Sequence, residues 1–297
     1  MAKQTVALLG TGTMGSGMVR NLRRAGFPLA VHNRTRTKAE QFASQGVRIA
    51  DTPADAATGT AVAVSMLADD DASRAVWLGP QGALKALQEG AIVIECGTVT
   101  PDWIRELHAA AQRRKLRMMD APVTGSRAQA EAGELTFLVG SDAETLAAAR
   151  PVLEAMSKAV LHLGPLGSGA ELKLINNFLC GVQAASFAEA LAWIERTGLD
   201  RTQAVDFLQA GAPGSGIFKA MSERMTSRNY EINFKLRLME KDLRYAHDAA
   251  AEADLALSTA ACAEQIFKKA HAAGYGEKDM AAIVEILRVE HSPSAAD

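Results

Sequence analysis

The chain has 297 residues, enough for one large domain or two ordinary domains with a sizeable core. Hydrophobic residues make up 48% and charged residues 22%, which is typical of a globular protein. A net charge of -2 gives no general electrostatic reason to bind nucleic acid or an acidic membrane surface.

The cysteines and the apolar runs argue against a disulfide-rich, a zinc-binding or a membrane-spanning protein. Cys96, Cys180 and Cys262 are too widely spaced for a disulfide framework or a zinc site, so we expect buried thiols in a reducing compartment. The chain runs from Met1 straight into a strand-like segment, so we expect no cleavable signal peptide. Its longest uncharged run, Leu174–Ala188, is shorter than a membrane span. These features predict a cytoplasmic protein with no membrane or nucleic-acid partner.

The first motif is a glycine-rich turn between a strand and a helix. Thr5–Leu9 is a short apolar run typical of a buried parallel strand, and Ser16–Ala25 has helical periodicity. A GxGxxG pattern alone is weak evidence, but these flanks are the context that a dinucleotide-binding turn requires. The pyrophosphate of such a cofactor lies on the helix N-terminus. The predicted cofactor contacts in this turn are Gly10, Thr11, Gly12, Thr13, Met14 and Gly15.

The end of the second strand indicates which dinucleotide binds. NAD-binding units usually place a carboxylate there to hold the ribose 2′-hydroxyl, and here the strand Pro28–His32 ends in Asn33. Asn33 removes the repulsion against a 2′-phosphate, and Arg34 can face that phosphate directly. Thr35 and Lys38 are further possible donors. The alternative is a solvated loop whose basic residues have no role; the pattern favours NADP(H).

Strand-like and helical segments alternate over the first half of the chain. The further predicted strands are Thr60–Leu67, Ala91–Glu95, Leu116–Met119 and Leu135–Val139, with helices such as Pro101–Lys115 and Ala143–Met156 between them. This alternation predicts an α/β domain with a doubly wound parallel sheet, in which ligands bind at the carboxyl ends of the strands. The additional pocket residues are then Leu67, Ala68, Thr98, Thr124, Gly125 and Ser126. Asp69–Asp71 resemble a metal site, but a solvated helix start explains them better, and we expect no metal.

After Gly164 the pattern becomes helical almost to the end. Helices are expected at Ser168–Thr197, Arg201–Gln209, Ile217–Met225, Leu236–Ala253, Ala256–Ala273 and Glu277–Val289, and we expect the tail His291–Asp297 to fray. We therefore predict an α/β domain over residues 1–164 and an all-α domain over residues 165–297. Because clefts between domains are preferred ligand sites, a site near this junction is expected.

A lysine stands just past that junction. Gly164, Gly167 and Gly169 precede it, and Lys173 and Asn177, four residues apart, share one helical face. Lys173 is the last charged residue before the uncharged run, which predicts a buried helix. Its amine either extends to water or works with a perturbed pKa, and the spacing alone leaves both readings open.

Four motifs in order then suggest a family. The cofactor motif GxGxMGxxMxxNL is matched from Gly10 to Leu22, and the substrate motif DAPVSG by Asp120–Gly125. The catalytic motif GxxGxGxxxKxxxN is matched from Gly164 to Asn177, and the motif KDL by Lys241–Leu243. Over nearly its whole length the chain resembles the β-hydroxyacid dehydrogenase family, which includes 3-hydroxyisobutyrate dehydrogenase and the glyoxylate/succinic semialdehyde reductases.

The resemblance implies an N-terminal Rossmann-type domain, a helical C-terminal domain that dimerises, and a homodimer or homotetramer. It implies that Lys173 is the catalytic general acid/base and that Asn177 supports it. The residues that it places around the substrate or cofactor are Thr98, Thr124, Gly125, Phe234, Lys241 and Asp242, with Thr98 and Lys241 touching the cofactor. The Asn33–Thr35 turn resembles the NADPH-preferring branch, whose members reduce glyoxylate and succinic semialdehyde. The expected substrate is thus a small carbonyl compound or the matching hydroxy acid, with its carboxylate held around Thr124, Gly125 and Ser126.

Two departures from the family pattern weaken the assignment of a particular substrate more than that of the reaction class. Thr124 and Gly97 stand where the family usually has serine. Two rival readings remain. Imine reductases share the two-domain plan but typically replace the catalytic lysine, whereas this chain keeps Lys173. A non-catalytic NADP(H)-binding module would be typical of relatives that have lost that lysine.

Overall fold

The structure is a computed structural model that describes residues 3–289, so the tail His291–Asp297, expected to fray, lies outside the described residues. The chain divides into two compact units, Met1–Lys173 (unit 1) and Leu174–Asp297 (unit 2), and the division falls inside a helix. No helix among residues 3–289 is long and apolar enough to cross a membrane.

Unit 1 is built on one mixed, mostly parallel sheet, as predicted for a Rossmann-type domain. Its strand order is β3-β2-β1-β4-β5-β6-β8-β7, with β9 paired to β8. All pairs from β3 to β6 are parallel, as is β8 with β9. The strands are β1 (Val6–Leu9), β2 (Leu29–His32), β3 (Arg48–Ile49), β4 (Val62–Ser65), β5 (Ile92–Glu95), β6 (Arg117–Asp120), β7 (Val123–Thr124), β8 (Leu135–Gly140) and β9 (Ser157–Gly164).

The sheet differs from the expected parallel sheet at one edge. β8 runs antiparallel to both β6 and β7, because only the short helix α6 (Arg127–Ala132) separates β7 from β8 and no long crossover returns the chain. β9 was also not predicted. Its side chains are half-buried or exposed, including Leu161 and Leu163, so it lacks the continuous apolar run of a central strand.

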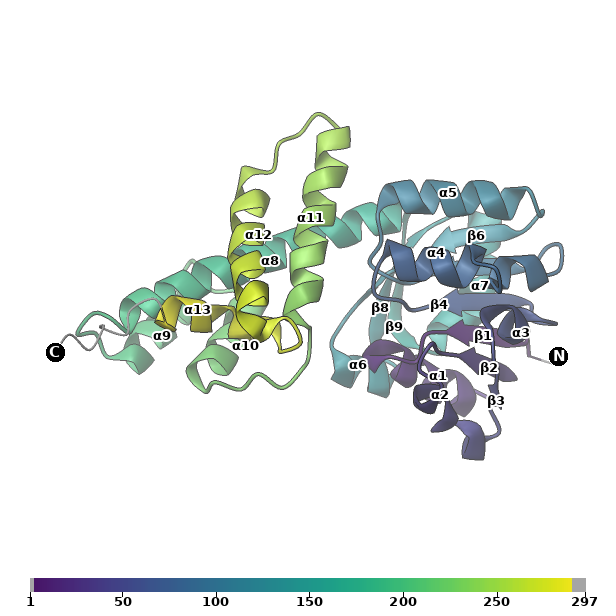
Figure 1. Cartoon of the computed structure of the whole chain (residues 1–297), viewed down its shortest axis with the longest axis horizontal. Helices are drawn as coiled ribbons and strands as arrows, with labels where there is room; N and C mark the ends of the chain where they lie inside the picture. The colour runs from purple at the N-terminus through teal and green to yellow at the C-terminus, as the bar shows by residue number, and fades with distance from the viewer. Residues whose placement is uncertain (1–2, 290–297) are drawn as a thin grey trace. The chain divides into compact units, whose positions relative to one another are not determined.

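Helices cover both faces of this sheet (Figure 1). Val6 and Leu8 pack on one face with α1 and α7, while Ala7 and Leu9 pack on the other with α3, α4 and α5. This alternation follows from the two-residue period of a strand. The helices are α1 (Thr13–Arg24), α2 (Thr37–Glu40), α3 (Pro53–Ala57), α4 (Asp70–Leu78), α5 (Pro101–Gln112) and α7 (Ala143–Glu154), with short turns η1 (Ala43–Gln45) and η2 (Ala83–Ala86).

The acidic run Asp69–Asp71 begins α4, as predicted for a helix start. Asp69 is the N-cap and accepts a hydrogen bond from the Ala72 N–H at 2.8 Å. Asp70 accepts from both the N–H and the hydroxyl of Thr100, at 3.0 and 2.6 Å. Among the described residues no group of three His, Cys, Asp or Glu side chains is arranged to hold a metal ion.

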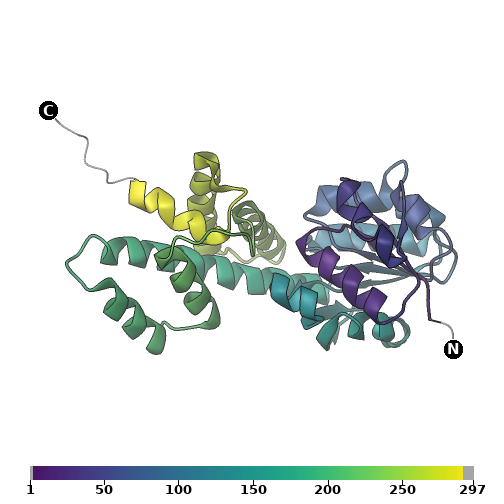
Figure 2. The same cartoon turned by 90° about the horizontal axis from the view of Figure 1, so that it is seen from below.

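Unit 2 is helical. The long helix α8 (Ser168–Ile194) begins in unit 1 and runs on as one unbroken helix (Figure 2). Phe187, Leu243 and Phe267 are fully buried in the core of unit 2, where α11 and α12 lie side by side (Figure 1). The other elements are α9 (Arg201–Ala210), α10 (Gly216–Thr226), α11 (Leu236–Glu252), α12 (Ser258–Ala270), η3 (His271–Tyr275), η4 (Met280–Ile283) and α13 (Val284–Val289).

The three cysteines are free thiols, but they are not uniformly buried. Cys96 is buried, Cys180 is half-buried and Cys262 is exposed. The expectation of buried thiols is therefore wrong for Cys262, which lies on the solvent side of the amphipathic helix α12.

Candidate active site

The glycine turn leaves open space at the N-terminus of α1. A Cβ on Gly10, whose φ is +103°, would lie 2.4 Å from the Met66 carbonyl oxygen, so only glycine fits there. A Cβ on Gly12 would meet no atom within 4 Å. Gly12 is the N-cap of α1 and supplies no side-chain cap, and the first turn carries no acidic residue. Thr11 Oγ1 is buried without a hydrogen-bond partner among residues 3–289. These features fit a dinucleotide pyrophosphate on the backbone N–H groups of α1.

Asn33 ties the end of β2 to that turn. Its Oδ1 accepts from the Thr11 N–H and its Nδ2 donates to the Thr35 carbonyl, both at 2.9 Å. Arg34, Thr35 and Lys38 are exposed. Arg36 pairs with Glu40 and Asp51, whereas Arg34 forms no ion pair with any residue from 3 to 289. The guanidinium of Arg34 is therefore open to a phosphate.

His32, at the end of β2, has a structural environment. Its Nδ1 lies 3.3 Å from the Ala50 carbonyl oxygen, and burial lowers the pKa of the imidazole. A neutral ring that bonds to the neighbouring chain segment agrees with the structural role predicted for it.

The ends of β1, β4 and β5 meet at the same edge of the sheet. A Cβ on Gly10 would lie 2.9 Å from Leu67 Cδ2, and a Cβ on Gly97 would lie 3.0 Å from the Leu67 carbonyl oxygen. Leu67, Ala68 and Thr98 are all half-buried. The structure thus brings these predicted pocket residues together with the glycine turn.

A buried carboxylate network, which the sequence did not predict, supports the turn before Thr98. Glu95 Oε1 accepts from the Gly97 N–H at 2.8 Å, and Oε2 accepts from Trp77 Nε1 at 3.0 Å and from the Ser73 hydroxyl. Ser73 Oγ in turn accepts from Trp103 Nε1 at 2.8 Å. Complete burial raises the pKa of Glu95. The only sequence signal is a glutamate that ends an otherwise apolar strand.

Thr124, Gly125 and Ser126 form the link between β7 and α6. Thr124 is half-buried, and Gly125 is exposed with φ of +134°. Ser126 is the N-cap of α6: its hydroxyl accepts from the Ala128 N–H at 3.2 Å, and its own N–H donates to Gln129 Oε1 at 2.7 Å. The Ser126 side chain is therefore committed to capping, which leaves the Thr124 hydroxyl as the freer donor in this segment.

Asn21, in the cofactor motif, connects α1 to α6. Its Nδ2 donates to the carbonyl oxygens of Ala130 and Gly17, at 2.8 and 2.9 Å. A Cβ on Gly17 would lie 2.5 Å from the Ala130 carbonyl oxygen, so the two helices touch backbone to backbone. The helix that begins at the glycine turn thus also positions the Thr124–Ser126 segment.

Lys173 lies on α8, one turn before Asn177. The lysine is 9% exposed, which argues against a side chain that extends into solvent. A fully buried carboxylate, Asp120 at the end of β6, accepts from the N–H groups of Gly167 and Ala170 at the start of the same helix, at 2.7 Å each.

In unit 2, three of the predicted residues form one connected group. Asn177 Nδ2 donates to Asp242 Oδ2 at 2.6 Å, and Lys241 Nζ lies 2.9 Å from Asp242 Oδ1. The Lys241 ammonium also lies 4.6 Å from the centre of the Tyr245 ring. All three polar side chains are at least nine-tenths buried. Phe234 is half-buried at the margin of the unit 2 core, and its N–H donates to Asp279 Oδ2 at 3.0 Å.

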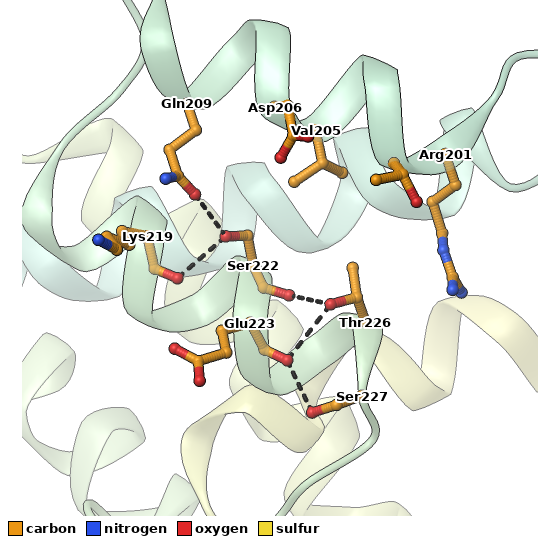
Figure 3. A pocket seen from close by; sticks show the side chains of 10 residues that line it. Arg201, Val205, Asp206, Gln209, Lys219, Ser222, Glu223, Thr226 and Ser227 are labelled. Atoms are coloured by element: carbon orange, nitrogen blue, oxygen red, sulfur yellow. Dashed lines mark hydrogen bonds between the residues drawn. The ribbon is translucent and has the colours of Figure 1, made fainter.

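A cavity of about 440 Å³ between α9 and α10 contains none of the predicted site residues (Figure 3). Its buried hydroxyl, that of Ser222, has two acceptors for its one proton: the Lys219 carbonyl oxygen at 2.9 Å and Gln209 Oε1 at 3.3 Å. Its charged side chains have both signs: Arg201, Lys219, Asp206 and Glu223. These satisfied hydrogen bonds and mixed charges give no reason to move the active site there.

Comparison with known proteins decides the family. Residues 5–164 match the NAD binding domain of 6-phosphogluconate dehydrogenase, and residues 167–287 match the family described as NAD-binding of NADP-dependent 3-hydroxyisobutyrate dehydrogenase. The chain belongs to the 3-hydroxyisobutyrate dehydrogenase-like β-hydroxyacid dehydrogenases.

Similar members of this family differ in the names that they carry. The chain is 34% identical to an NAD-dependent L-serine dehydrogenase of Pseudomonas aeruginosa, over 95% of this chain and 97% of that protein. It is 31% identical to glyoxylate/succinic semialdehyde reductase 1 of Arabidopsis thaliana, over 95% and 98% of the two chains. The structure of Mycobacterium tuberculosis 3-hydroxyisobutyrate dehydrogenase with L-serine is similar, with a TM-score of 0.87 and 30% identity over 96% and 99% of the two chains.

As a β-hydroxyacid dehydrogenase, the protein is an oxidoreductase with NAD(P)-binding domains. The family assignment does not decide between NAD and NADP, nor between serine, glyoxylate and 3-hydroxyisobutyrate chemistry.

Proposed function

We propose that this β-hydroxyacid dehydrogenase uses NADPH to reduce a small aldehyde or 2-keto acid, such as glyoxylate or succinic semialdehyde, and catalyses the reverse oxidation of the hydroxy acid. The observation that carries the proposal is the burial of Lys173 one turn before Asn177, whose amide is bonded to Asp242. A second candidate is oxidation of a β-hydroxy acid such as L-serine, because two similar proteins carry L-serine in their names or titles.

The cofactor site that we propose follows the carboxyl ends of β1, β2, β4 and β5. Arg34 favours NADPH because its exposed guanidinium has no ion-pair partner among residues 3–289. When bound, the reduced nicotinamide supplies the hydride. The residues that would hold the cofactor are Gly10–Gly15, Asn33, Arg34, Thr35, Lys38, Leu67, Ala68, Thr98 and Lys241.

Lys173 is the proposed general acid/base. In reduction its ammonium group donates a hydrogen bond to the carbonyl oxygen, stabilises the negative charge that develops there, and then gives up a proton. In oxidation the neutral amine accepts the hydroxyl proton. A buried cation stabilises this charge more than a solvated one does, because little water competes with it.

Asn177 has a fixed orientation in this proposal. Its NH₂ group donates to Asp242 Oδ2, while the other oxygen of that side chain lies 2.9 Å from Lys241 Nζ. Asn176 Nδ2 donates to Asn177 Oδ1 at 2.9 Å and holds the other end of the amide. Asn177 can therefore aim the lysine or the reacting oxygen with little side-chain freedom to lose.

The remaining proposed roles concern the substrate. The Thr124 hydroxyl and the Gly125 N–H would bind its carboxylate, with Thr98 and Ser126 nearby and Phe234 as an apolar wall. We also propose a homodimer or homotetramer, since Trp193, Leu199 and Phe207 expose large apolar surfaces in unit 2. Light scattering of the purified protein tests this, and a monomer at micromolar concentration would contradict it.

Cofactor-oxidation assays separate the candidate functions. Glyoxylate, succinic semialdehyde, methylglyoxal and tartronate semialdehyde are tested with NADPH and NADH, and L-serine and 3-hydroxyisobutyrate with NADP⁺ and NAD⁺. Turnover of glyoxylate or succinic semialdehyde supports the proposal. Turnover of L-serine alone favours the second candidate. An active imine control with inactive carbonyls favours an imine reductase. Silence on all substrates with intact cofactor binding favours a non-catalytic binding module.

Replacement of Lys173 tests the assigned role directly. Lys173→Ala should lower kcat on the active substrate by about 10²-fold or more, because general-acid catalysis and charge stabilisation are both lost. Cofactor affinity, measured by fluorescence titration, should stay nearly unchanged. The exposed Lys158→Ala is the matched control and should leave both quantities unchanged. Full activity in Lys173→Ala would contradict the assignment.

A further inference from the structure

We propose that Asp120 is a positioning residue for Lys173, acting through the first turn of α8. This inference rests on the proposed function, since it presumes that Lys173 is the general acid/base. It assigns a role to the first residue of the substrate motif, which otherwise has no part in the reaction.

The carboxylate of Asp120 clamps the start of α8 onto the sheet. Its Oδ1 accepts from the Gly167 N–H and its Oδ2 from the Ala170 N–H, each at 2.7 Å. Asp120 is the last residue of β6 and is completely buried, as is nearly all of Ala170. Both carboxylate oxygens are thus fixed on one helical turn, and Lys173 lies only three residues beyond Ala170.

Two glycines make room for this clamp. A Cβ on Gly169 would lie 2.2 Å from the Leu138 carbonyl oxygen and 2.8 Å from Asp120 Oδ2. A Cβ on Gly140 would lie 2.4 Å from Asp120 Oδ1 and 2.7 Å from the Pro165 carbonyl oxygen. The glycines before Lys173 therefore let the helix backbone approach the strand ends closely, where the carboxylate can reach it.

A carboxylate suits this position for a physical reason. The first N–H groups of a helix have no partner within the helix, and the helix dipole favours negative charge there. An ionised carboxylate offers an acceptor to each of two N–H groups, whereas an amide offers its oxygen alone. Burial raises the pKa of Asp120 to about 6, so the group is mostly ionised above neutral pH. Loss of the clamp frees the turn that sets the direction of Lys173.

A purely structural role would look different, and the chain contains a matched control. Asp142 is the N-cap of α7 and accepts from the N–H and hydroxyl of Thr145, at 2.7 and 2.8 Å. No predicted site residue lies on α7. Asp142→Asn should therefore remove one of two acceptor oxygens at a helix start, the same chemical change as in Asp120→Asn, without moving Lys173.

The experiment compares Asp120→Asn with Asp142→Asn in the full-length protein, using the carbonyl substrate that the wild type reduces best. Reduced cofactor is titrated by fluorescence, so that kcat is expressed per cofactor-binding site and unfolded protein does not count. We expect Asp120→Asn to lower this kcat by about 10- to 100-fold, because a misplacement of about 1 Å can cost 10²-fold in rate. Its cofactor Kd should stay close to the wild-type value, because none of the proposed cofactor contacts lies on the helical turn that Asp120 holds. Asp142→Asn should lower the melting temperature and leave kcat per site unchanged.

A second readout concerns the proton itself. The solvent deuterium isotope effect on kcat should rise in Asp120→Asn, because proton donation by a misaligned lysine becomes slower, and should not change in Asp142→Asn. Equal kcat per site in Asp120→Asn and the wild type would overturn the inference while leaving the proposed function intact. If Lys173→Ala is fully active, the proposed role of Lys173 is wrong, and the inference about Asp120 falls with it.

Hydrogen exchange on the unmodified protein tests the clamp without any variant. The Gly167 and Ala170 amides should exchange at least about 10²-fold more slowly than exposed turn amides, as expected for amides held in hydrogen bonds to a buried carboxylate. Exchange at the rate of an exposed turn would mean that the clamp is absent, and the inference would fall whatever the kinetics.

Discussion

Arg34 is the side chain on which the choice between NADPH and NADH depends in our proposal. A charge-assisted hydrogen bond to a phosphate contributes about 1.5–3 kcal/mol, or about 10- to 100-fold in affinity. Arg34→Ala should therefore reduce the preference for NADPH over NADH, measured as the ratio of kcat/KM values, by about that factor. Arg36→Ala is the control, because Arg36 already pairs with Glu40 and Asp51. An unchanged ratio in Arg34→Ala would show that the phosphate is bound elsewhere.

At the same scale, the close packing around position 97 explains why a glycine fits there. Gly97 stands where the family usually has serine, and a Cβ there would lie 2.9 Å from Glu95 Oε1 and 3.0 Å from the Leu67 carbonyl oxygen. Glu95 Oε1 occupies that space because it accepts from the Gly97 N–H. A side chain at position 97 would thus compete for space with the buried glutamate two residues earlier.

This competition can be measured with a double-mutant cycle. Gly97→Ser should lower the free energy of unfolding by about 1–3 kcal/mol, as overpacking does. Glu95→Asp withdraws the carboxylate, so the double variant should lose less stability than the sum of the two single losses. Denaturant titration gives all four values. Strict additivity would show that the two positions do not share the space.

At the scale of elements, the packing of α1 against α6 depends on the side-chain amide of Asn21. Asn21→Leu keeps the branching and the number of side-chain heavy atoms but leaves the Ala130 carbonyl without its donor, and should destabilise the protein by about 1–3 kcal/mol in denaturant titration. Because α6 follows Thr124–Ser126, the KM of the carbonyl substrate should rise as well. Asn229→Ala, at an exposed turn, should change the free energy of unfolding by less than about 0.5 kcal/mol. Equal effects at the two positions would contradict the role of Asn21.

The sequence predicted most elements because the local signals and the packing agree. Thr100, Asp142 and Asp200 stand at helix starts and cap them, and the strand of the glycine turn is an uninterrupted apolar run. β3, β7 and β9 escaped prediction, because β3 and β7 have only two residues each and β9 is half-exposed. Neither the Asp120 clamp nor the Glu95 network is indicated by a clear pattern in the sequence. Asp120 binds N–H groups 47 and 50 residues away, which no local pattern reveals.

At the scale of the whole molecule, the buried carboxyl groups of unit 1 make the free energy of unfolding depend on pH. Burial raises the pKa of Asp120 from 3.8 to about 6. A group with a raised acid pKa binds more protons in the folded state, so its contribution to stability falls as pH rises through the window from about 4 to about 6. At 1.36 kcal/mol per pKa unit, the fall amounts to about 3 kcal/mol. Burial raises the pKa of Glu95 in the same direction.

The difference in unfolding free energy between the wild type and Asp120→Asn isolates this contribution. It should decrease by about 2 kcal/mol between pH 4 and pH 6.5, because the asparagine does not titrate. Urea titrations at several pH values measure it, and the other carboxylates cancel in the subtraction. A pH-independent difference would mean that Asp120 has a normal pKa in the folded protein.

The Glu95 network also contains two tryptophans that can serve as intrinsic fluorescence probes. The chain has three tryptophans; Trp77 and Trp103 are fully buried in that network, and Trp193 in unit 2 is 73% exposed. In the dissociated subunit, iodide in solution should quench the emission of Trp193 and leave that of the other two. The unquenched, blue-shifted fraction of the intrinsic fluorescence would then report on unit 1, so that the unfolding of each unit can be followed in one sample without any attached dye.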